Sequence, residues 1–195
     1  MKQLGLLALL ILFCSSSLLI FAQENKEEQT AAQQIWMDYM TPSTNHKMMA
    51  KSAGEWKITM QMWEGPDTKP VQSEGTCKSE MILGGRYMQS KFSSTFMGMP
   101  FEGISTDGYD NAKKVYINTW IDNMGTGFMY GEGKYDPDTK TIVYNGTMFE
   151  PIQKKNLTYR QNVQMVDDNH MVMEMFNTNK DGKEYKSMHV EYVRK

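Results

Sequence analysis

From Glu55 to its C-terminus the chain alternates apolar and polar residues with a period of two. In the first such segment Trp56, Ile58 and Met60 alternate with polar residues. This alternation gives a strand one buried face and one solvent-exposed face. The pattern therefore predicts ten β-strands. After the strand that begins at Glu55, they cover residues 71–82, 86–97, 101–109, 114–122, 127–135, 140–149, 156–166, 170–178 and 183–193.

The connections between these segments are short and rich in turn residues. Gly84-Gly85, Asp110-Asn111 and Asn179-Lys180-Asp181-Gly182 are examples, and such sequences favour hairpins over helical crossovers. Ten antiparallel strands in a row fit a sandwich or an up-and-down barrel, and closure leaves no strand edge unpaired. We predict an all-β fold, a ten-stranded antiparallel barrel.

The residues before the strands follow a helical period instead. Ala32, Ile35, Trp36, Tyr39 and Met40 lie on one side of a helix. A break at Thr41-Pro42 follows, and then a second short helix that Ser43 or Thr44 caps and Gly54 ends. We expect residues 23–43 to form a helical preface with a disordered start, and residues 44–195 to form the barrel domain.

The first 22 residues have the character of a secretory signal peptide. Lys2 precedes an apolar run that ends at Ala22, and a strongly polar stretch begins at Gln23. This predicts export to the periplasm or beyond, with no stable membrane span once the leader is cleaved. The run is also long enough to span a bilayer, so an uncleaved anchor is the alternative.

Removal of the 22 leader residues from the 195 leaves 173, which suits one domain. The leader holds one Lys and no acid, so the remainder has 20 basic and 23 acidic side chains and a net charge of −3. This balance does not indicate a nucleic-acid partner. Cys77 is the one cysteine left, so no disulfide forms within the chain, and we expect a small buried strand residue.

One alternating set of residues is predicted to point into the barrel. Strand 114–122 is ambiguous, because either of its two faces could point inward: Val115, Ile117 and Ile121, or Tyr116, Asn118 and Trp120. The first choice would make the interior purely apolar, and the second would allow it to form hydrogen bonds. The remaining inward set is Met88, Ser90, Phe92, Ser94, Phe96, Leu157, Tyr159, Val163, Met165, Met171, Met173, Met175, Met188, Val190 and Tyr192.

Methionine takes the place of leucine once the leader is removed, because residues 23–195 contain 18 methionines and only two leucines, Leu83 and Leu157. Three interpretations follow: plain core filling, a pliable cavity wall for varied ligands, or Cu(I) held by thioethers. Copper would draw on pairs and triplets that share a strand face, namely Met60/Met62, Met97/Met99 and Met171/Met173/Met175. The spread of methionines over the whole chain argues against copper, so core filling comes first and the pliable wall second, and we expect no metal and no cofactor.

No catalytic motif is evident. The three histidines lie far apart without zinc-type spacing. Asp107, Asp110 and Asp122 with Glu102 could form paired carboxylates, but Asp110 and Asp122 stand at turn starts, where aspartate caps its own backbone. We predict turn roles for these two residues.

Several motifs resemble a known family. Gly54-Glu55-Trp56 at the first strand is similar to the G-x-W signature of lipocalins and other calycins, in which a basic residue of the last strand covers the tryptophan; Arg194 is the matching residue. The other motifs identify the chain over residues 44–194 as a member of the domain-of-unknown-function 1579 family, which implies a calycin-like barrel and supplies no catalytic residue. They are His46-Lys47, Leu83-Gly84-Gly85-Arg86-Tyr87, Met97-Gly98-Met99-Pro100-Phe101-Glu102-Gly103, Gly108-Tyr109-Asp110-Asn111, Thr119-Trp120-Ile121-Asp122 and Met124-Gly125-Thr126-Gly127.

Three functional hypotheses remain open. The first is non-catalytic binding of a small apolar or amphipathic molecule in the barrel. The second is an enzyme that uses Asp110 or Asp122 as a base, and the third is a packed barrel that acts as an interaction module. For the first hypothesis the predicted ligand-binding residues are Trp56, Met60, Met88, Phe92, Trp120, Tyr159 and Met173.

Overall fold

The computed structural model describes residues 28–195. The signal-peptide prediction for residues 1–22 and the expected disorder at the start of the preface lie outside this range. Residues 28–40 are helical, as predicted, and their apolar side chains Ile35, Trp36 and Tyr39 are exposed. In the part of the chain that the structure describes, no helix is long and apolar enough to cross a membrane.

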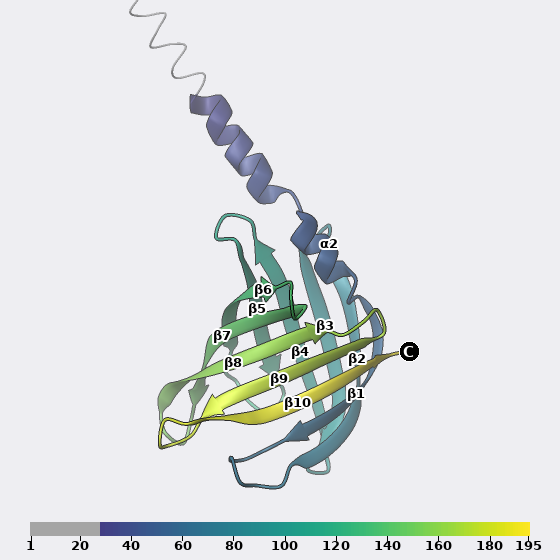
Figure 1. The fold of residues 1–195 in the computed structure, drawn as a ribbon, viewed down its shortest axis with the longest axis vertical. Helices are drawn as coiled ribbons and strands as arrows, with labels where there is room; N and C mark the ends of the chain where they lie inside the picture. The colour runs from purple at the N-terminus through teal and green to yellow at the C-terminus, as the bar shows by residue number, and fades with distance from the viewer. Residues whose placement is uncertain (1–27) are drawn as a thin grey trace, which may run out of the picture. The chain divides into compact units, whose positions relative to one another are not determined.

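The ten predicted strands are present and form a closed antiparallel barrel (Figure 1). Each strand pairs with its neighbours in sequence, and β1 closes the barrel by pairing with β10 from Trp56↔Arg194 to Met62↔Met188. The fold prediction is confirmed, and the predicted bounds of β2 and β9 match the observed ones. The strands are β1 Gly54–Met62, β2 Val71–Ile82, β3 Tyr87–Phe96, β4 Met99–Asp110, β5 Val115–Asp122, β6 Met129–Asp136, β7 Thr141–Glu150, β8 Lys155–Met165, β9 His170–Thr178 and β10 Glu184–Arg194.

The predicted turn roles of two aspartates are confirmed. Asp110 Oδ1 accepts the backbone N–H groups of Ala112 at 2.8 Å and Lys113 at 2.9 Å. Asp122 Oδ1 accepts the N–H of Met124 at 2.9 Å. Both side chains stabilise hairpin turns by taking up backbone donors that have no strand partner.

Helix α2, Thr44–Ala50, packs against inner residues at one end of the barrel. The N–H of Ser43 donates to His46 Nδ1 at 2.9 Å at the start of the helix. His46 is buried, and this burial lowers the pKa of its imidazole. Met49, also buried, packs with Tyr116 and Tyr144 inside the barrel. The helix therefore covers the interior on this side.

The same end is sealed by Trp56, which has no exposed surface. Its indole Nε1–H donates to Ser52 O at 3.1 Å, and the Arg194 guanidinium lies 4.1 Å from the indole ring. Arg194 also donates to the carbonyl oxygens of Ala53 at 2.7 Å and Lys51 at 2.8 Å. The predicted match between the tryptophan and the basic residue of the last strand is confirmed.

Candidate functional site

The barrel encloses a cavity of about 500 Å³. All ten strands and α2 contribute residues to its wall. Because this space is open, the interior of the barrel is not fully packed. Of the 19 methionines in the chain, 13 line this cavity. They are Met48, Met49, Met60, Met62, Met88, Met124, Met129, Met148, Met165, Met171, Met173, Met175 and Met188.

The structure brings together five of the seven predicted ligand-binding residues. Met60, Met88, Phe92, Trp120 and Met173 all line the cavity. The other two are buried beside it without lining it. Trp56 seals the end next to α2, and Tyr159 lies within the wall at 3% exposure.

Strand β5 turns its polar and aromatic residues inward. Tyr116 and Asn118 are buried, Asn118 and Trp120 line the cavity, and Ile121 is 46% exposed on the outside. Phe92 packs edge-on against Trp120 with ring centroids 5.1 Å apart. The ambiguity in this strand is resolved in favour of an interior that can form hydrogen bonds.

A carboxylate, Asp107, faces the cavity from β4. Its Oδ1 accepts from Asn118 Nδ2 at 2.8 Å and its Oδ2 accepts from Ser105 Oγ at 3.1 Å. Burial raises the pKa of the Asp107 carboxyl to about 6, against the opposing effect of these two hydrogen bonds. Near neutral pH this group therefore exchanges protons readily and can act as a hydrogen-bond acceptor or as a base.

Sequence reasoning placed Asp107 among the carboxylates and gave it no role. A signal for its position was available in the period of β4, where Ser105 and Asp107 share a face, and in β5, where Asn118 lies on the same face as Tyr116 and Trp120. The missing information was the register, since Asp107 and Asn118 are directly opposite each other.

A second polar group lines the wall on β2 and β3. The hydroxyls of Ser79 and Ser90 lie 2.7 Å apart, and Cys77 Sγ lies 3.5 Å from Ser79 Oγ. Cys77 is a free buried cysteine, as predicted. Burial raises the pKa of its thiol to about 11, so the sulfur stays protonated and is a poor nucleophile.

The side chain of Tyr159 extends from β8 across Gly146 and Gly131, in the direction of the strands that carry Asn118 and Asp107. In register, Asp107 pairs with Asn118, Asn118 with Gly131, Gly131 with Gly146, and Gly146 with Tyr159. The Tyr159 hydroxyl is buried and has no hydrogen-bond partner among the described residues. Burial, with a smaller effect of the Asp107 charge, raises the pKa of this phenol to about 12, so it remains neutral.

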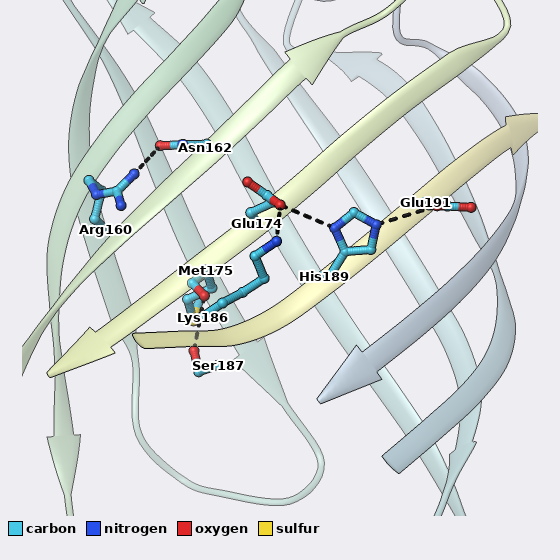
Figure 2. Close-up of polar contacts among 8 residues, drawn as sticks. All are labelled: Arg160, Asn162, Glu174, Met175, Lys186, Ser187, His189 and Glu191. Atoms are coloured by element: carbon cyan, nitrogen blue, oxygen red, sulfur yellow. Dashed lines mark hydrogen bonds and ion pairs between the residues drawn. The ribbon is translucent and has the colours of Figure 1, made fainter. Parts of the chain in front are cut away.

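The outer face of β8–β10 carries a network of charged side chains (Figure 2). Lys186 Nζ lies 2.5 Å from Glu174 Oε1, and His189 lies 3.4 Å from both Glu174 and Glu191. The hydrogen bond from Lys186 lowers the pKa of Glu174. These groups pair with one another on the barrel surface, where such pairs contribute little, so we do not assign them a binding role.

Another concavity, of about 650 Å³, lies over the outer face of β2–β5. Its wall includes the exposed side chains Lys78, Lys91 and Glu102. These long side chains are exposed to water, so this depression offers a less defined environment than the interior cavity.

Two of the three methionine groups considered for copper share the cavity, those at Met60/Met62 and Met171/Met173/Met175. Met97 and Met99 are exposed instead, on and beside the β3–β4 turn. Within residues 28–195 no group of three or more His, Cys, Asp or Glu side chains could hold a metal ion. The thioethers that line the cavity come from α2, from the β5–β6 connection and from seven of the ten strands.

Comparison with known proteins agrees with this architecture. Among solved structures, Rv2717c from M. tuberculosis is similar at a TM-score of 0.60 and 8% identity, covering 80% of this chain and 99% of its own. A redesigned β-barrel (TM-score 0.39, 14% identity, 75% of this chain and 95% of its own) and a de novo designed fluorescence-activating β-barrel (TM-score 0.40, 14% identity, 73% and 93%) are more distant. No curated protein sequence matches this chain.

The likeness to Rv2717c concerns the fold alone, because the identity is so low. The family comparison is more specific. The model of the family described as "Protein of unknown function (DUF1579)" matches residues 41–194, which include α2 and all ten strands. The chain therefore belongs to the DUF1579 family, as its sequence motifs indicated.

Proposed function

We propose that this protein is exported and holds a small apolar or amphipathic molecule inside its barrel. The observation that carries the proposal is the interior cavity of about 500 Å³, walled by methionine and aromatic side chains with polar groups among them. This volume lies within the range of about 300–1,000 Å³ that is typical of small-molecule sites. A fully packed interaction module would leave no such space.

The methionine wall supports a site that adapts to its ligand. Methionine has three rotatable side-chain bonds and a polarizable sulfur, so it repacks around differently shaped apolar groups at small cost. The polar groups of Asp107, Asn118 and the Ser79–Ser90 pair give the wall a place to fix the polar end of a ligand.

Native mass spectrometry of the protein purified without its leader tests for a retained small molecule. A titration with N-phenyl-1-naphthylamine, a neutral dye that fluoresces in apolar surroundings, tests the cavity directly. We expect one dye per chain. Met173→Trp, which fills the cavity, should weaken dye binding about tenfold or more, whereas Val172→Trp, at a neighbouring position outside the cavity wall, should not. Equal dye binding by both variants, or none by the wild type, would refute the proposal.

The apolar run before Ala22, with Lys2 ahead of it, supports export. We expect the protein recovered from the cell envelope of an expressing bacterium to begin at Gln23. Intact-mass measurement of the protein from periplasmic and cytoplasmic fractions checks this. A full-length chain confined to the cytoplasm would contradict export and leave the cavity proposal in place.

A second candidate function is general-base catalysis within the same cavity. The observation that favours it is the carboxyl group of Asp107, which faces the cavity with a pKa of about 6. The probe 5-nitrobenzisoxazole reports on such a base, because removal of its ring proton opens it to a coloured phenolate. If Asp107 acts as a base, the rate rises with pH through about 6 and disappears in Asp107→Asn. Equal rates in both proteins would remove this candidate.

A further inference from the structure

The cavity wall contains negative charge without a matching positive charge. Among the lining residues of the described chain, Asp107 and Asp122 are the only carboxylic acids, and no Lys, Arg or His takes part. Asp122 is occupied by the turn N–H of Met124 and by the Trp120 indole, whose Nε1 lies 2.7 Å from Asp122 Oδ2. Asp107, by contrast, lies within β4 and caps no turn.

Asp107 has hydrogen-bond partners but no ionic partner. Asn118 and Ser105 each donate one hydrogen bond to it, and none of the ion pairs found in residues 28–195 includes it. A carboxylate oxygen accepts more than one hydrogen bond, so both oxygens retain acceptor capacity toward the cavity. A charge that is buried without a counter-charge is costly, and a cation that enters the site removes that cost.

The surroundings of Asp107 also suit a cation. The rings of Phe92 and Trp120 also line the cavity, and aromatic faces attract ammonium groups.

We propose that the ligand of this barrel is an apolar amine, whose ammonium group binds Asp107 and whose hydrocarbon part lies against the methionine and aromatic wall. This inference rests on the proposed binding function and specifies its ligand class. An anionic amphiphile such as a fatty acid would bring a second negative charge into the same enclosed space, where like charges repel strongly. A neutral alcohol would fill the cavity without compensating Asp107.

Three probes with the same hydrocarbon chain separate these cases: dodecylamine, dodecanol and dodecanoate. Each displaces bound N-phenyl-1-naphthylamine at about pH 8, where the amine is charged and the Asp107 carboxyl is ionised. We expect the amine to displace the dye at a concentration about tenfold or more below that of the alcohol, and the carboxylate to be the weakest. This ranking needs no mutant and is unaffected by folding defects.

The variant Asp107→Asn should abolish the difference between amine and alcohol while it still binds the neutral dye, which also shows that it is folded. Glu102→Gln removes an exposed carboxylate from the same strand and should keep the amine preference. If the dye binds but the amine has no advantage, or keeps its advantage in Asp107→Asn, the amine inference is wrong and the binding function stands. If the dye does not bind the wild type, the binding function itself fails.

Discussion

Tyr159 on β8 occupies the space that Gly146 leaves open on β7. The two residues are directly opposite each other, and a Cβ added at Gly146 would lie 2.5 Å from both the Cζ and the hydroxyl oxygen of Tyr159. It would also meet the carbonyl oxygen of Tyr130. Glycine at this position is therefore what allows the phenol to lie flat along the wall and reach β6.

Gly146→Ala should consequently destabilise the barrel, by about 1–3 kcal/mol as is usual for overpacking. Neither the tyrosine ring, held at 3% exposure, nor the backbone carbonyl can move away freely. Urea unfolding followed by tryptophan fluorescence measures the loss. Gly127→Ala is the matched control, because no atom lies within 4 Å of its added Cβ. Equal stability of the two variants would contradict the packing role of Gly146.

Arg194 closes the barrel end by covering Trp56, and Arg194→Ala should cost about 2–4 kcal/mol of unfolding free energy. The substitution removes a cation–π contact and hydrogen bonds to the carbonyls of Lys51, Ala53 and Asp168. Arg194→Lys should recover only part of this, because lysine lacks the planar fork. The comparison is made by denaturant titration, with Lys195→Ala as the neighbouring control. A loss as large in Lys195→Ala would mean that the contacts of Arg194 are not responsible.

Asp107 should make the stability of the barrel depend on pH. Its pKa rises from an unfolded value of 3.8 to about 6, so the folded state favours the protonated form. The contribution of Asp107 to the unfolding free energy is therefore most favourable below about pH 4, where the carboxyl group is protonated in both states. This contribution is lost as the pH rises through about 6 and the carboxyl group of the folded protein ionises.

Asp107→Asn keeps the shape of the side chain and removes its charge. It should raise the unfolding free energy by roughly 1–3 kcal/mol at about pH 8 and by much less near about pH 4. Urea titrations of both proteins across this pH range measure the difference. A difference that stays constant with pH would show that the carboxyl group does not titrate as described.

Cys77 should resist thiol reagents as long as the barrel is folded. It is 2% exposed, and its thiol has a pKa of about 11, so neither access nor thiolate is available. In the chain from Gln23 onward, an aromatic disulfide reagent should label no thiol in buffer and one thiol per chain in denaturant. Ser93→Cys adds a thiol on the exposed face of β3 and should label at once. Rapid labelling of wild-type Cys77 would indicate that the wall opens readily.

Much of the barrel could be predicted because alternation and turn chemistry are local. The inward positions of Met88, Phe92 and Met173 follow from the period of two within each strand, and the turn role of Asp110 follows from its place before Asn111. The residues of the cavity wall were predicted less completely than the strands. Trp56 has the right period but lies beneath Arg194 at the sealed end, because the position along the barrel axis depends on the whole strand register.

The sequence by itself therefore determined the number of strands, their antiparallel order and, on most strands, which side chains face inward. Only the tertiary structure decided that β5 turns Asn118 and Trp120 inward, that Asp107 lies opposite Asn118, and that the methionines surround an open cavity. These features depend on pairing between separate strands and on the balance between side-chain volume and barrel interior, which no local pattern contains.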